Sequence, residues 1–387
     1  MNLQVRSSLL PGALVLLVFP LLRAQDMSWA DHMARASEFA GRGQFARAEV
    51  EYREALKMAE AHEAAVGEQP ALPLAKTLNN VGMAYAAQFR LIEAESFLRR
   101  AVREWERGLG PTHGDVAIGL TNLGNILCSQ GRLAEARQAY QRALHIRENE
   151  AEPLALARGL NNLAEVLRKE GDDAGAELLL RRAARVLGDS ETAEAAASLN
   201  NLGQIFAARA NHIEAEPLLR RAIAIWEQVS GPEHPSVAAG LNNLGALYRD
   251  LGRYTEAEAL YRRSLAIREK TQGPGHPDYA QSLSNLAVLY FDQRRFAEAE
   301  TLLRDSLAIT RTVLGPAHPD LGLRLVNLGD LLARVRRYTA AEAFYRQALQ
   351  IERGKEWSNT REKLASLLRV QGRIQEAKRL YRKSLAE

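Results

Sequence analysis

The chain has 387 residues, of which 47% are hydrophobic and 25% are charged, as is typical of a globular protein with a sizeable core. This composition excludes a disordered chain, a collagen-like chain and a polytopic membrane protein. The 51 Lys and Arg residues nearly balance the 47 Asp and Glu residues, and the formal net charge of +4 argues against nucleic acid as the main partner. The single cysteine, Cys128, allows neither an intramolecular disulfide nor a cysteine-based zinc site.

Residues 1–24 differ from the rest of the chain. An apolar run between residues 9 and 22 is interrupted by Pro11 and Pro20, and it is too short and too broken for a confident membrane span. Ala24, followed by polar residues, offers a cleavage point. We expect a signal peptide, an exported protein in the periplasm or outside the cell, and no stable membrane insertion after cleavage. An uncleaved N-terminal anchor and a mis-assigned start codon are the alternatives.

Residues 28–387 form a tandem array in which the motif Leu-Asn-Asn-Leu-Gly and its variants recur every 39 to 42 residues. The first leucines of the central motifs are Leu78, Leu120, Leu160, Leu199, Leu241, Leu283 and Leu325. With one flanking unit at each end, the array predicts nine units near residues 29–66, 75–116, 117–156, 157–195, 196–236, 237–278, 279–320, 321–357 and 358–387.

Each unit has the pattern of a helix, a tight turn and a second helix. In residues 237–278, the apolar positions from Leu241 to Tyr248 follow i, i+3, i+4 spacing, Gly252 interrupts the pattern, and the pattern then resumes. Thr255 has a side chain suited to an N-cap, so the second helix is expected to begin near it.

Two positions of the unit carry only small residues, as a close approach of two helices requires. The second helix has an invariant alanine at Ala48, Ala94, Ala136, Ala176, Ala215, Ala257, Ala299, Ala341 and Ala377. The first helix has a small residue at Ala36, Gly82, Gly124, Ala164, Gly203, Gly245, Ala287, Gly329 and Ala365. This pattern resembles the tetratricopeptide repeat. With its Gly-Pro-x-His-Pro linkers at 231–235, 273–277 and 315–319, the unit is similar to the 42-residue subtype of kinesin light chains.

The resemblance implies an all-α fold, a right-handed superhelical solenoid of about nine helix-turn-helix repeats, whose first helices line a concave groove for an extended peptide or partner segment. The chain lacks the N-terminal heptad segment of kinesin light chains, so a motor role is not expected.

One position of the first helix, expected to face the groove, is asparagine in all seven central units. These residues, here called the asparagine ladder, are Asn80, Asn122, Asn162, Asn201, Asn243, Asn285 and Asn327. A carboxamide has one acceptor and two donors, which match the C=O and N–H of a peptide backbone. The resemblance supports this role, because other tetratricopeptide grooves use asparagines in this way. The alternative is that the ladder only braces neighbouring units.

Less uniform groove positions would select the side chains of the ligand. They include the basic residues Lys76, Arg158, Arg168, Lys169 and Arg249 and the apolar residues Ile118, Phe291 and Leu323. This mixture predicts a ligand with acidic residues or a carboxylate at one end and an apolar anchor at the other. A solvated face with scattered charges is an equal alternative.

Arginine pairs on the second helices, such as Arg262-Arg263, follow a glutamate four residues earlier in most units, so helix ion pairs on a convex surface are expected rather than nucleic-acid contacts. The linker histidines His113, His234, His276 and His318 are a repeat apart, which favours hydrogen-bonding roles in the linkers over a shared metal site. Cys128 is expected on a first helix near the groove.

The sequence has no phosphate loop, no nucleophile elbow and no dinucleotide fingerprint, and we expect no enzyme activity, cofactor or metal. We therefore expect a scaffold or adaptor that binds a protein or peptide segment. Two further hypotheses are a peptide-responsive regulator and a structural protein that self-associates through its last unit, where Leu380, Tyr381 and Leu385 lack a capping helix.

Overall fold

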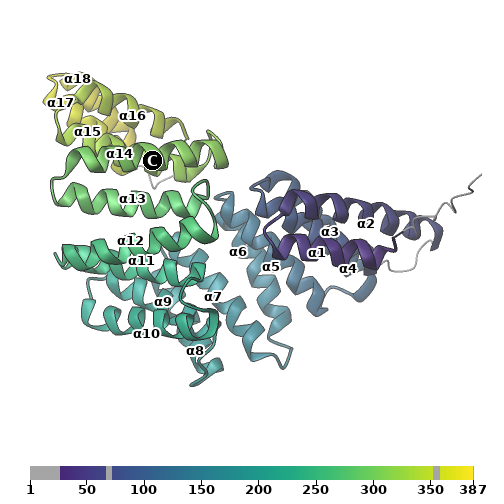
Figure 1. Cartoon of the computed structure of the whole chain (residues 1–387). Helices are drawn as coiled ribbons and strands as arrows, with labels where there is room; N and C mark the ends of the chain where they lie inside the picture. Colours follow the sequence, from purple (N-terminus) through teal and green to yellow (C-terminus); the bar gives the residue numbers. More distant parts are fainter. Residues whose placement is uncertain (1–26, 67–71, 352–357, 387) are drawn as a thin grey trace, which may run out of the picture.

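The computed structural model describes residues 27–66, 72–351 and 358–386, so the expected signal peptide lies outside the described residues. These residues form eighteen helices, shown in Figure 1. Their bounds are α1 Trp29–Gly41, α2 Phe45–Val66, α3 Leu72–Ala87, α4 Leu91–Leu109, α5 Gly114–Ser129, α6 Leu133–Arg147, α7 Pro153–Lys169, α8 Asp173–Leu187, α9 Ala193–Ala208, α10 His212–Ser230, α11 Pro235–Asp250, α12 Tyr254–Thr271, α13 Pro277–Asp292, α14 Phe296–Leu314, α15 Pro319–Arg334, α16 Tyr338–Ile351, α17 Ser358–Val370 and α18 Ile374–Ala386.

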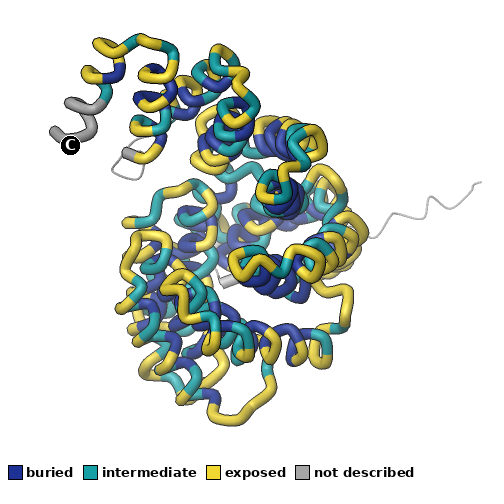
Figure 2. The backbone as a smooth tube through the Cα atoms, turned by 90° about the vertical axis from the view of Figure 1, so that its left-hand side faces the viewer, coloured by how far each residue is buried: buried dark blue, intermediate teal, exposed yellow. Residues whose placement is uncertain are grey.

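Each odd-numbered helix packs against the even-numbered helix that follows it, and the described residues contain no strand. The helix pairs are called units 1 to 9, from α1 with α2 to α17 with α18. This arrangement confirms the all-α solenoid of helix-turn-helix units. Buried residues follow the chain along the whole tube in Figure 2, because each unit packs mainly on its neighbours.

The small residues allow the two helices of a unit to approach closely. All nine alanines of the second helices are buried. On the first helices, a Cβ added at Gly245 would lie 2.9 Å from a ring carbon of Tyr261, and one added at Gly124 would lie 2.7 Å from Tyr140. The glycines therefore leave the space that the large residue of the second helix fills.

The linker histidines cap the helices that follow them. The Nδ1 atoms of His113, His234, His276 and His318 accept the backbone N–H two residues later, at N–N distances of 3.1 to 3.2 Å. This confirms the hydrogen-bonding role expected for them. Because Nδ1 accepts, the proton of each neutral ring resides on Nε2.

The expected N-cap at Thr255 was wrong. Helix α12 begins at Tyr254, and the residue before it, Arg253, makes no side-chain cap. Instead, the Arg253 guanidinium forms hydrogen bonds with Glu256 in the first turn, and its Nη1 atom lies 3.2 Å from a carboxylate oxygen of Glu216 in the preceding unit. Thr255 therefore lies inside the helix, and the residue at the N-cap position forms a cross-unit ion pair instead of a side-chain cap.

The second helices carry the ion pairs that the sequence predicted. All six pairs of a glutamate with the arginine four residues later are formed, namely Glu95–Arg99, Glu177–Arg181, Glu216–Arg220, Glu258–Arg262, Glu300–Arg304 and Glu342–Arg346. Such partly exposed pairs contribute about 0.3–0.5 kcal/mol each, so they support single helices more than the solenoid as a whole.

Contacts between units match a large residue with a small one. Where α10 meets α11, a Cβ added at Gly240 would lie 3.1 Å from the indole of Trp226. In the contact of α14 with α15 the sizes are exchanged, because Arg324 stands at the position of Gly240 and Thr310 at that of Trp226. Arg324 is 2% exposed and donates to Oε1 of Gln281 at 3.1 Å, and its burial lowers the pKa of its guanidinium.

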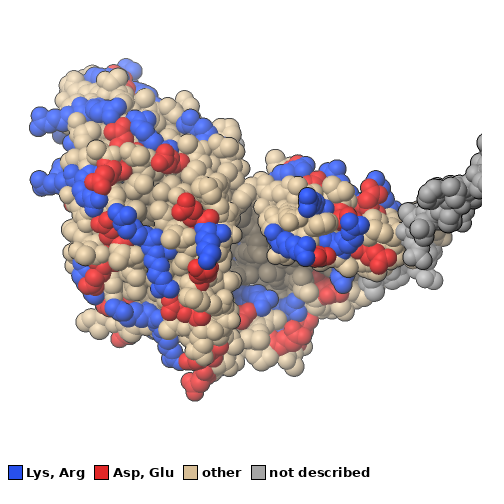
Figure 3. All heavy atoms as spheres, in the orientation of Figure 1, with Lys and Arg blue, Asp and Glu red and all other residues tan. Residues whose placement is uncertain are grey.

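The solenoid curves until its N-terminal units face its C-terminal units. In Figure 1, α1 to α6 lie to the right of α9 to α18, and Figure 3 shows the surface hollowed between the two parts. The parts meet where the turns of units 2 and 3 touch the linkers before α13 and α15. This contact, here called the seam, consists of Phe89, Ser129 and Gly131 on one side and His276, His318 and Pro319 on the other.

Candidate functional site

Three neighbouring pockets lie along α5. The proximal pocket, of about 420 Å³, includes Lys76, Asn80 and Ile118 in its lining. The central pocket, of about 260 Å³, shares Ile118 with it. The third, of about 710 Å³, shares Asn125 with the central pocket and is here called the seam pocket, because residues of the seam form part of its wall. The pockets therefore adjoin one another along α5, and their linings come from units 1 to 4 and, at the seam, from units 7 and 8.

One stripe of α5 forms the floor of this site. Residues Asp115, Ile118, Asn122, Asn125 and Ser129 recur every three or four positions and therefore share one face of the helix. An extended segment lying over this stripe would run along α5, from its N-terminal turn to its C-terminal turn.

The ladder position is half-buried in every central unit, whereas the residue before it is more deeply placed. All seven ladder asparagines are intermediate in exposure. Of the preceding residues, Asn79, Asn161, Asn200, Asn242, Ser284 and Val326 are buried and Thr121 is half-buried. The first residue of each pair therefore faces the neighbouring unit, and the second keeps part of its amide on the open face.

Two ladder amides are engaged within the protein. Asn122 donates its Nδ2–H to Oδ1 of Asn79 at 2.9 Å, and Asn243 donates to Oδ1 of Asn200 at 2.8 Å. Asn80 and Asn201 each accept a longer bond, of 3.2 and 3.3 Å, from the asparagine before them. Only the bonds of Asn122 and Asn243 join neighbouring units, so these two residues make the bracing contacts of the alternative interpretation.

The other three ladder residues, Asn162, Asn285 and Asn327, make no side-chain hydrogen bond to any part of the chain that the structure describes. Asn162 lines the central pocket. Its donors and its acceptor are therefore available to a ligand, and the ladder consists of two chemically different groups of asparagines.

The structure brings some of the predicted site residues together and not others. Asn80, Asn122, Asn162 and Arg158 line the proximal and central pockets. Lys76 and Ile118 also belong to these two linings, and Lys169 lines the seam pocket. The remaining predicted residues line none of the three pockets, and they are Asn201, Asn243, Asn285, Asn327, Arg168, Arg249, Phe291 and Leu323.

Cations outnumber carboxylates in the lining of the proximal and central pockets, where the charged residues are Lys76, Arg147, Arg158 and Asp115. Arg158 lies 2.5 Å from a carboxylate oxygen of Glu194, and it remains exposed. Lys76 is exposed and forms no ion pair with a described residue. Arg147 is paired with Glu150 at 2.5 Å, so Lys76 is the one cation of these two linings without an ion pair to a described residue.

Arg249 and Phe291 interact mainly with residues of their own surroundings. Arg249 lies 2.7 Å from Oδ1 of Asp250 and 3.6 Å from Oδ2 of Asp292. Burial alone would lower the pKa of this guanidinium, but the bond to Asp250 and the nearby carboxylates raise it. The Phe291 ring stands edge-on to that of Phe296, with centroids 5.8 Å apart.

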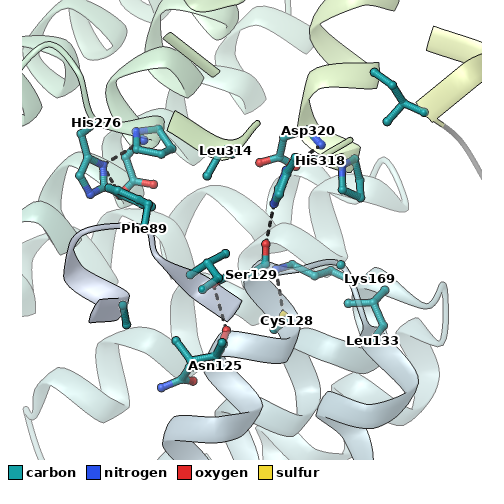
Figure 4. Close-up of a pocket in the computed structure, with 18 of the residues that line it drawn as sticks. Phe89, Asn125, Cys128, Ser129, Leu133, Lys169, His276, Leu314, His318 and Asp320 are labelled. Carbon is teal, nitrogen blue, oxygen red and sulfur yellow. Dashed lines mark hydrogen bonds and ion pairs between the residues drawn. The ribbon is translucent and has the colours of Figure 1, made fainter. Parts of the chain in front are cut away.

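The seam pocket combines segments that are far apart in the sequence, as Figure 4 shows. Nε2 of His318 lies 2.5 Å from the carbonyl oxygen of Ser129, and because Nδ1 accepts from Asp320, the Nε2–H is the donor. The Phe89 ring meets His276 edge-on at a centroid distance of 5.1 Å.

Cys128 lines the seam pocket at the end of α5, which confirms its expected place near the groove. The Lys169 amino group lies 3.4 Å from its sulfur and 3.0 Å from a carboxylate oxygen of Glu165. Burial raises the pKa of the Cys128 thiol, and Lys169 opposes this shift only in part. The thiol is therefore protonated at neutral pH and is a poor nucleophile.

Sequence reasoning missed the seam and the roles of Phe89, Asn125 and His318. The turn position of Phe89 gave no signal of its contact. Five units place glycine at the equivalent turn position, Gly43, Gly131, Gly171, Gly252 and Gly372, and all of these have positive φ. Phe89 has φ +58° there, but Ala210, Arg294 and Arg336 stand at the same position with φ between +56° and +64°, so this conformation belongs to the turn of the repeat and does not distinguish Phe89.

Within residues 27–66, 72–351 and 358–386, no group of three or more His, Cys, Asp and Glu side chains could hold a metal ion. No helix in these ranges is long and apolar enough to cross a membrane.

Comparisons with known proteins agree with the architecture. A family model described as Tetratricopeptide repeat matches residues 73–149, 115–189, 194–270, 236–312 and 278–353, and a second model of the same description matches residues 357–386. The chain belongs to the tetratricopeptide repeat family. Unit 1 precedes the matched repeats, yet its Ala36 and Ala48 are fully buried as in the other repeats. A search of curated proteins found no match.

Several solved repeat structures are similar. The apo form of RapI is 14% identical with a TM-score of 0.60, and the match covers 74% of this chain and 99% of that chain. A Rap protein complexed with Competence and Sporulation Factor is 16% identical with a TM-score of 0.58, covering 92% and 96%. BtubC (BKLC) from P. vanneervenii is 22% identical with a TM-score of 0.44, covering 58% and 89%. The likeness to the two Rap proteins concerns the fold alone.

Proposed function

We propose that this protein is a non-catalytic scaffold that binds an extended, acidic segment of a partner protein along α5. The observation that carries the proposal is the row of three adjoining pockets over one face of α5, from Lys76 at one end to Lys169 at the other. Tetratricopeptide repeat proteins are generally protein-interaction scaffolds, which supports the class of function.

The backbone of the segment would be held by amides of the ladder. Asn162 has both its donors and its acceptor free, and Asn122 uses one donor for Asn79 while its carbonyl oxygen remains available. Such contacts do not depend on the ligand's side chains, so they would supply affinity without sequence selectivity.

Selectivity would come from charge. Lys76 and Arg158 are exposed in the lining of the two smaller pockets, and a carboxylate of the ligand would compete with Glu194 for Arg158. Because these groups are solvent-accessible, the attraction would weaken as the salt concentration rises.

The protein would act outside the cytoplasm if residues 1–24 are an export signal. A fusion of residues 1–30 to a phosphatase that folds only after export tests this separately from the groove. Activity of the fusion supports export, and its absence contradicts it.

A second candidate is a peptide-responsive regulator. The similar Rap structure is a complex with Competence and Sporulation Factor, and the seam offers two contacts that a bound peptide could stabilise. Both candidates use the same site, and they differ in whether the peptide changes the shape of the solenoid.

The test is selection of a displayed library of random dodecapeptides on the full chain. We expect enriched peptides to be acidic and their binding to weaken at least tenfold in Arg158→Ala and in Asn162→Ala. A library that yields no enriched peptide, or one whose peptides bind both variants unchanged, would contradict the proposal.

Asn285→Ala is the matched control for Asn162→Ala. Both amides are half-buried and make no hydrogen bond to described residues, but only Asn162 lines one of the three pockets. Equal losses of affinity in the two variants would place the ligand along the whole ladder rather than along α5.

Self-association through the last unit stays a separate prediction. Leu380 is half-buried and packs against the core, while the side chains of Tyr381 and Leu385 lie outside the described residues. A monomer in light scattering at micromolar concentration would exclude it.

A further inference from the structure

We infer that the seam pocket is the anchor site for an apolar side chain of the bound segment, and that it is complete only when the solenoid closes on itself at the seam. This inference rests on the proposed function. It adds units 7 and 8, which contribute nothing to the two smaller pockets, to the binding site.

The first observation is the composition of the pocket wall. Units 2 and 3 contribute the apolar residues Met83, Leu91 and Leu133, and units 7 and 8 contribute Leu314 and Ile351. Polar residues, among them Lys169, Asp278 and Asp320, line the same pocket. The volume of about 710 Å³ lies within the range of about 300–1,000 Å³ that is usual for ligand pockets. An apolar side chain entering it would therefore be enclosed by residues from both ends of the curved chain.

The second observation is continuity. Asn125 lines both the central pocket and the seam pocket, so a chain lying over α5 can pass from the basic part of the site into the apolar part. The occupant is therefore one segment with acidic residues over Lys76 and Arg158 and an apolar residue beyond Asn125. Ser129 marks the end of α5 at which the anchor would enter.

The third observation is that the seam is held by specific contacts. Nδ1 of His318 accepts the backbone N–H of Asp320, and the Nε2–H of the same ring is donated to the carbonyl oxygen of Ser129. Only one neutral tautomer of the ring can make both bonds. The Phe89 ring stands edge-on to the His276 ring at a centroid distance of 5.1 Å. On the other side of the seam, a Cβ at Gly131 would lie 2.8 Å from Pro319, so the two edges are in close contact.

Since both sides of the seam line the pocket, an occupant that contacts both favours the closed form. Binding of the anchor and closure of the seam are then coupled, and each strengthens the other. Weakening the seam should lower ligand affinity even though the substituted residue lies outside the proximal and central pockets.

The experiment uses a double-mutant cycle between pocket and peptide. The probe is one dodecapeptide enriched from the library and its derivative with every apolar residue replaced by serine. We expect Leu314→Ser to weaken binding of the parent peptide at least tenfold and to leave binding of the serine derivative unchanged. Leu109→Ser is the control, because Leu109 is the equivalent half-buried residue of α4 and lines none of the three pockets.

Closure is measured without any ligand by energy transfer between fluorophores on the full chain, in a Cys128→Ser background with Ser96→Cys and Asp305→Cys as the labelled positions. We expect His318→Asn to lower the transfer efficiency, because asparagine keeps the N-cap but cannot reach Ser129. His234→Asn makes the same change in a linker away from the seam and should leave the efficiency unchanged.

The outcomes separate the two proposals. Loss of affinity in Asn162→Ala with unchanged affinity in Leu314→Ser would overturn the anchor pocket and leave the groove function standing. Unchanged affinity in both would overturn both. Equal weakening of the parent peptide and its serine derivative by Leu314→Ser would show a general structural defect and would also overturn the anchor assignment.

Discussion

The two groups of ladder asparagines should respond oppositely to removal of the amide. Asn243 donates to Asn200 at 2.8 Å, and Asn200 is 6% exposed, so water cannot readily replace the lost donor. Loss of this bond should cost about 1–2 kcal/mol, and the higher helix propensity of alanine should return about 0.5 kcal/mol. Asn243→Ala is therefore expected to lower the free energy of unfolding by about 1 kcal/mol.

For Asn162→Ala only the propensity contribution applies, because the Asn162 amide has no hydrogen-bond partner among the described residues. The expected effect is a gain of up to about 0.5 kcal/mol. The structure thus predicts a difference of about 1.5 kcal/mol between two substitutions that are identical in chemistry and equivalent in position.

The assay is urea unfolding combined with hydrogen exchange of the backbone amides in α7 and α11. Exchange is needed because repeat arrays often unfold in parts, so one midpoint does not describe the whole chain. Equal destabilisation by the two substitutions would refute the division of the ladder. It would also show that Asn162 braces the solenoid, which would remove a support of the proposed function.

Three further predictions follow from burial and charge. Gly245→Leu should destabilise its unit by more than about 3 kcal/mol, because Tyr261 occupies the space of even a Cβ, and calorimetry would detect the loss. Burial, helped by Arg268 and opposed by Asp278, lowers the pKa of His276 from its usual 6.5, so the folded state binds its proton more weakly than the unfolded chain. The free energy of unfolding should thus decrease as the pH falls below 6.5, and the decrease should stop once the folded pKa is passed; urea titrations against His276→Asn would reveal this. The raised pKa of Cys128 predicts slow alkylation by iodoacetamide at pH 7, which a peptide in the seam pocket should slow further.

The fold was predictable because each repeat contains, at fixed positions, the residues that its own packing requires. The alanine of the second helix and the small residue of the first occur at fixed spacing, and their neighbours fill the space that they leave, as Tyr261 does over Gly245. A pattern repeated nine times needs no knowledge of distant contacts. The same holds for the histidine caps, whose bonds reach only two residues along the chain.

The candidate site was predictable only in part. Half-buried asparagines at the ladder position follow from helical periodicity, but whether each amide is free depends on the residue one unit away. Asn122 finds Asn79 as a partner, whereas Asn162 lies at a position where the preceding unit offers Thr121 instead. The motif alone could not show this difference. Comparison of adjacent units does not show it either, because Asn285 makes no hydrogen bond to a described residue although the preceding unit offers Asn242, whose amide donates to Ser282 instead.

Arg324 can be understood only together with Thr310, the residue at the facing position of the preceding helix. A large cation at a position that is small in every other central unit contradicts the repeat pattern when it is considered by itself. Together with Thr310, which replaces the Trp226 of an earlier unit, it is an exchange of large and small across the same contact. Because of this exchange of a large and a small residue, the contact of α14 with α15 differs from that of α10 with α11 in a chain of otherwise similar repeats.

The seam could not be predicted because it depends on the curvature of the whole solenoid. His234 and His318 belong to linkers of the same Gly-Pro-x-His-Pro type and make the same cap, yet only His318 reaches across to Ser129. What differs is their place along the curve, since the small rotation between successive units accumulates until unit 8 stands against unit 3. A local motif thus acquires a second, distant contact from its place in the array. For this reason, a ligand that contacts both sides of the seam can act on the shape of the whole chain.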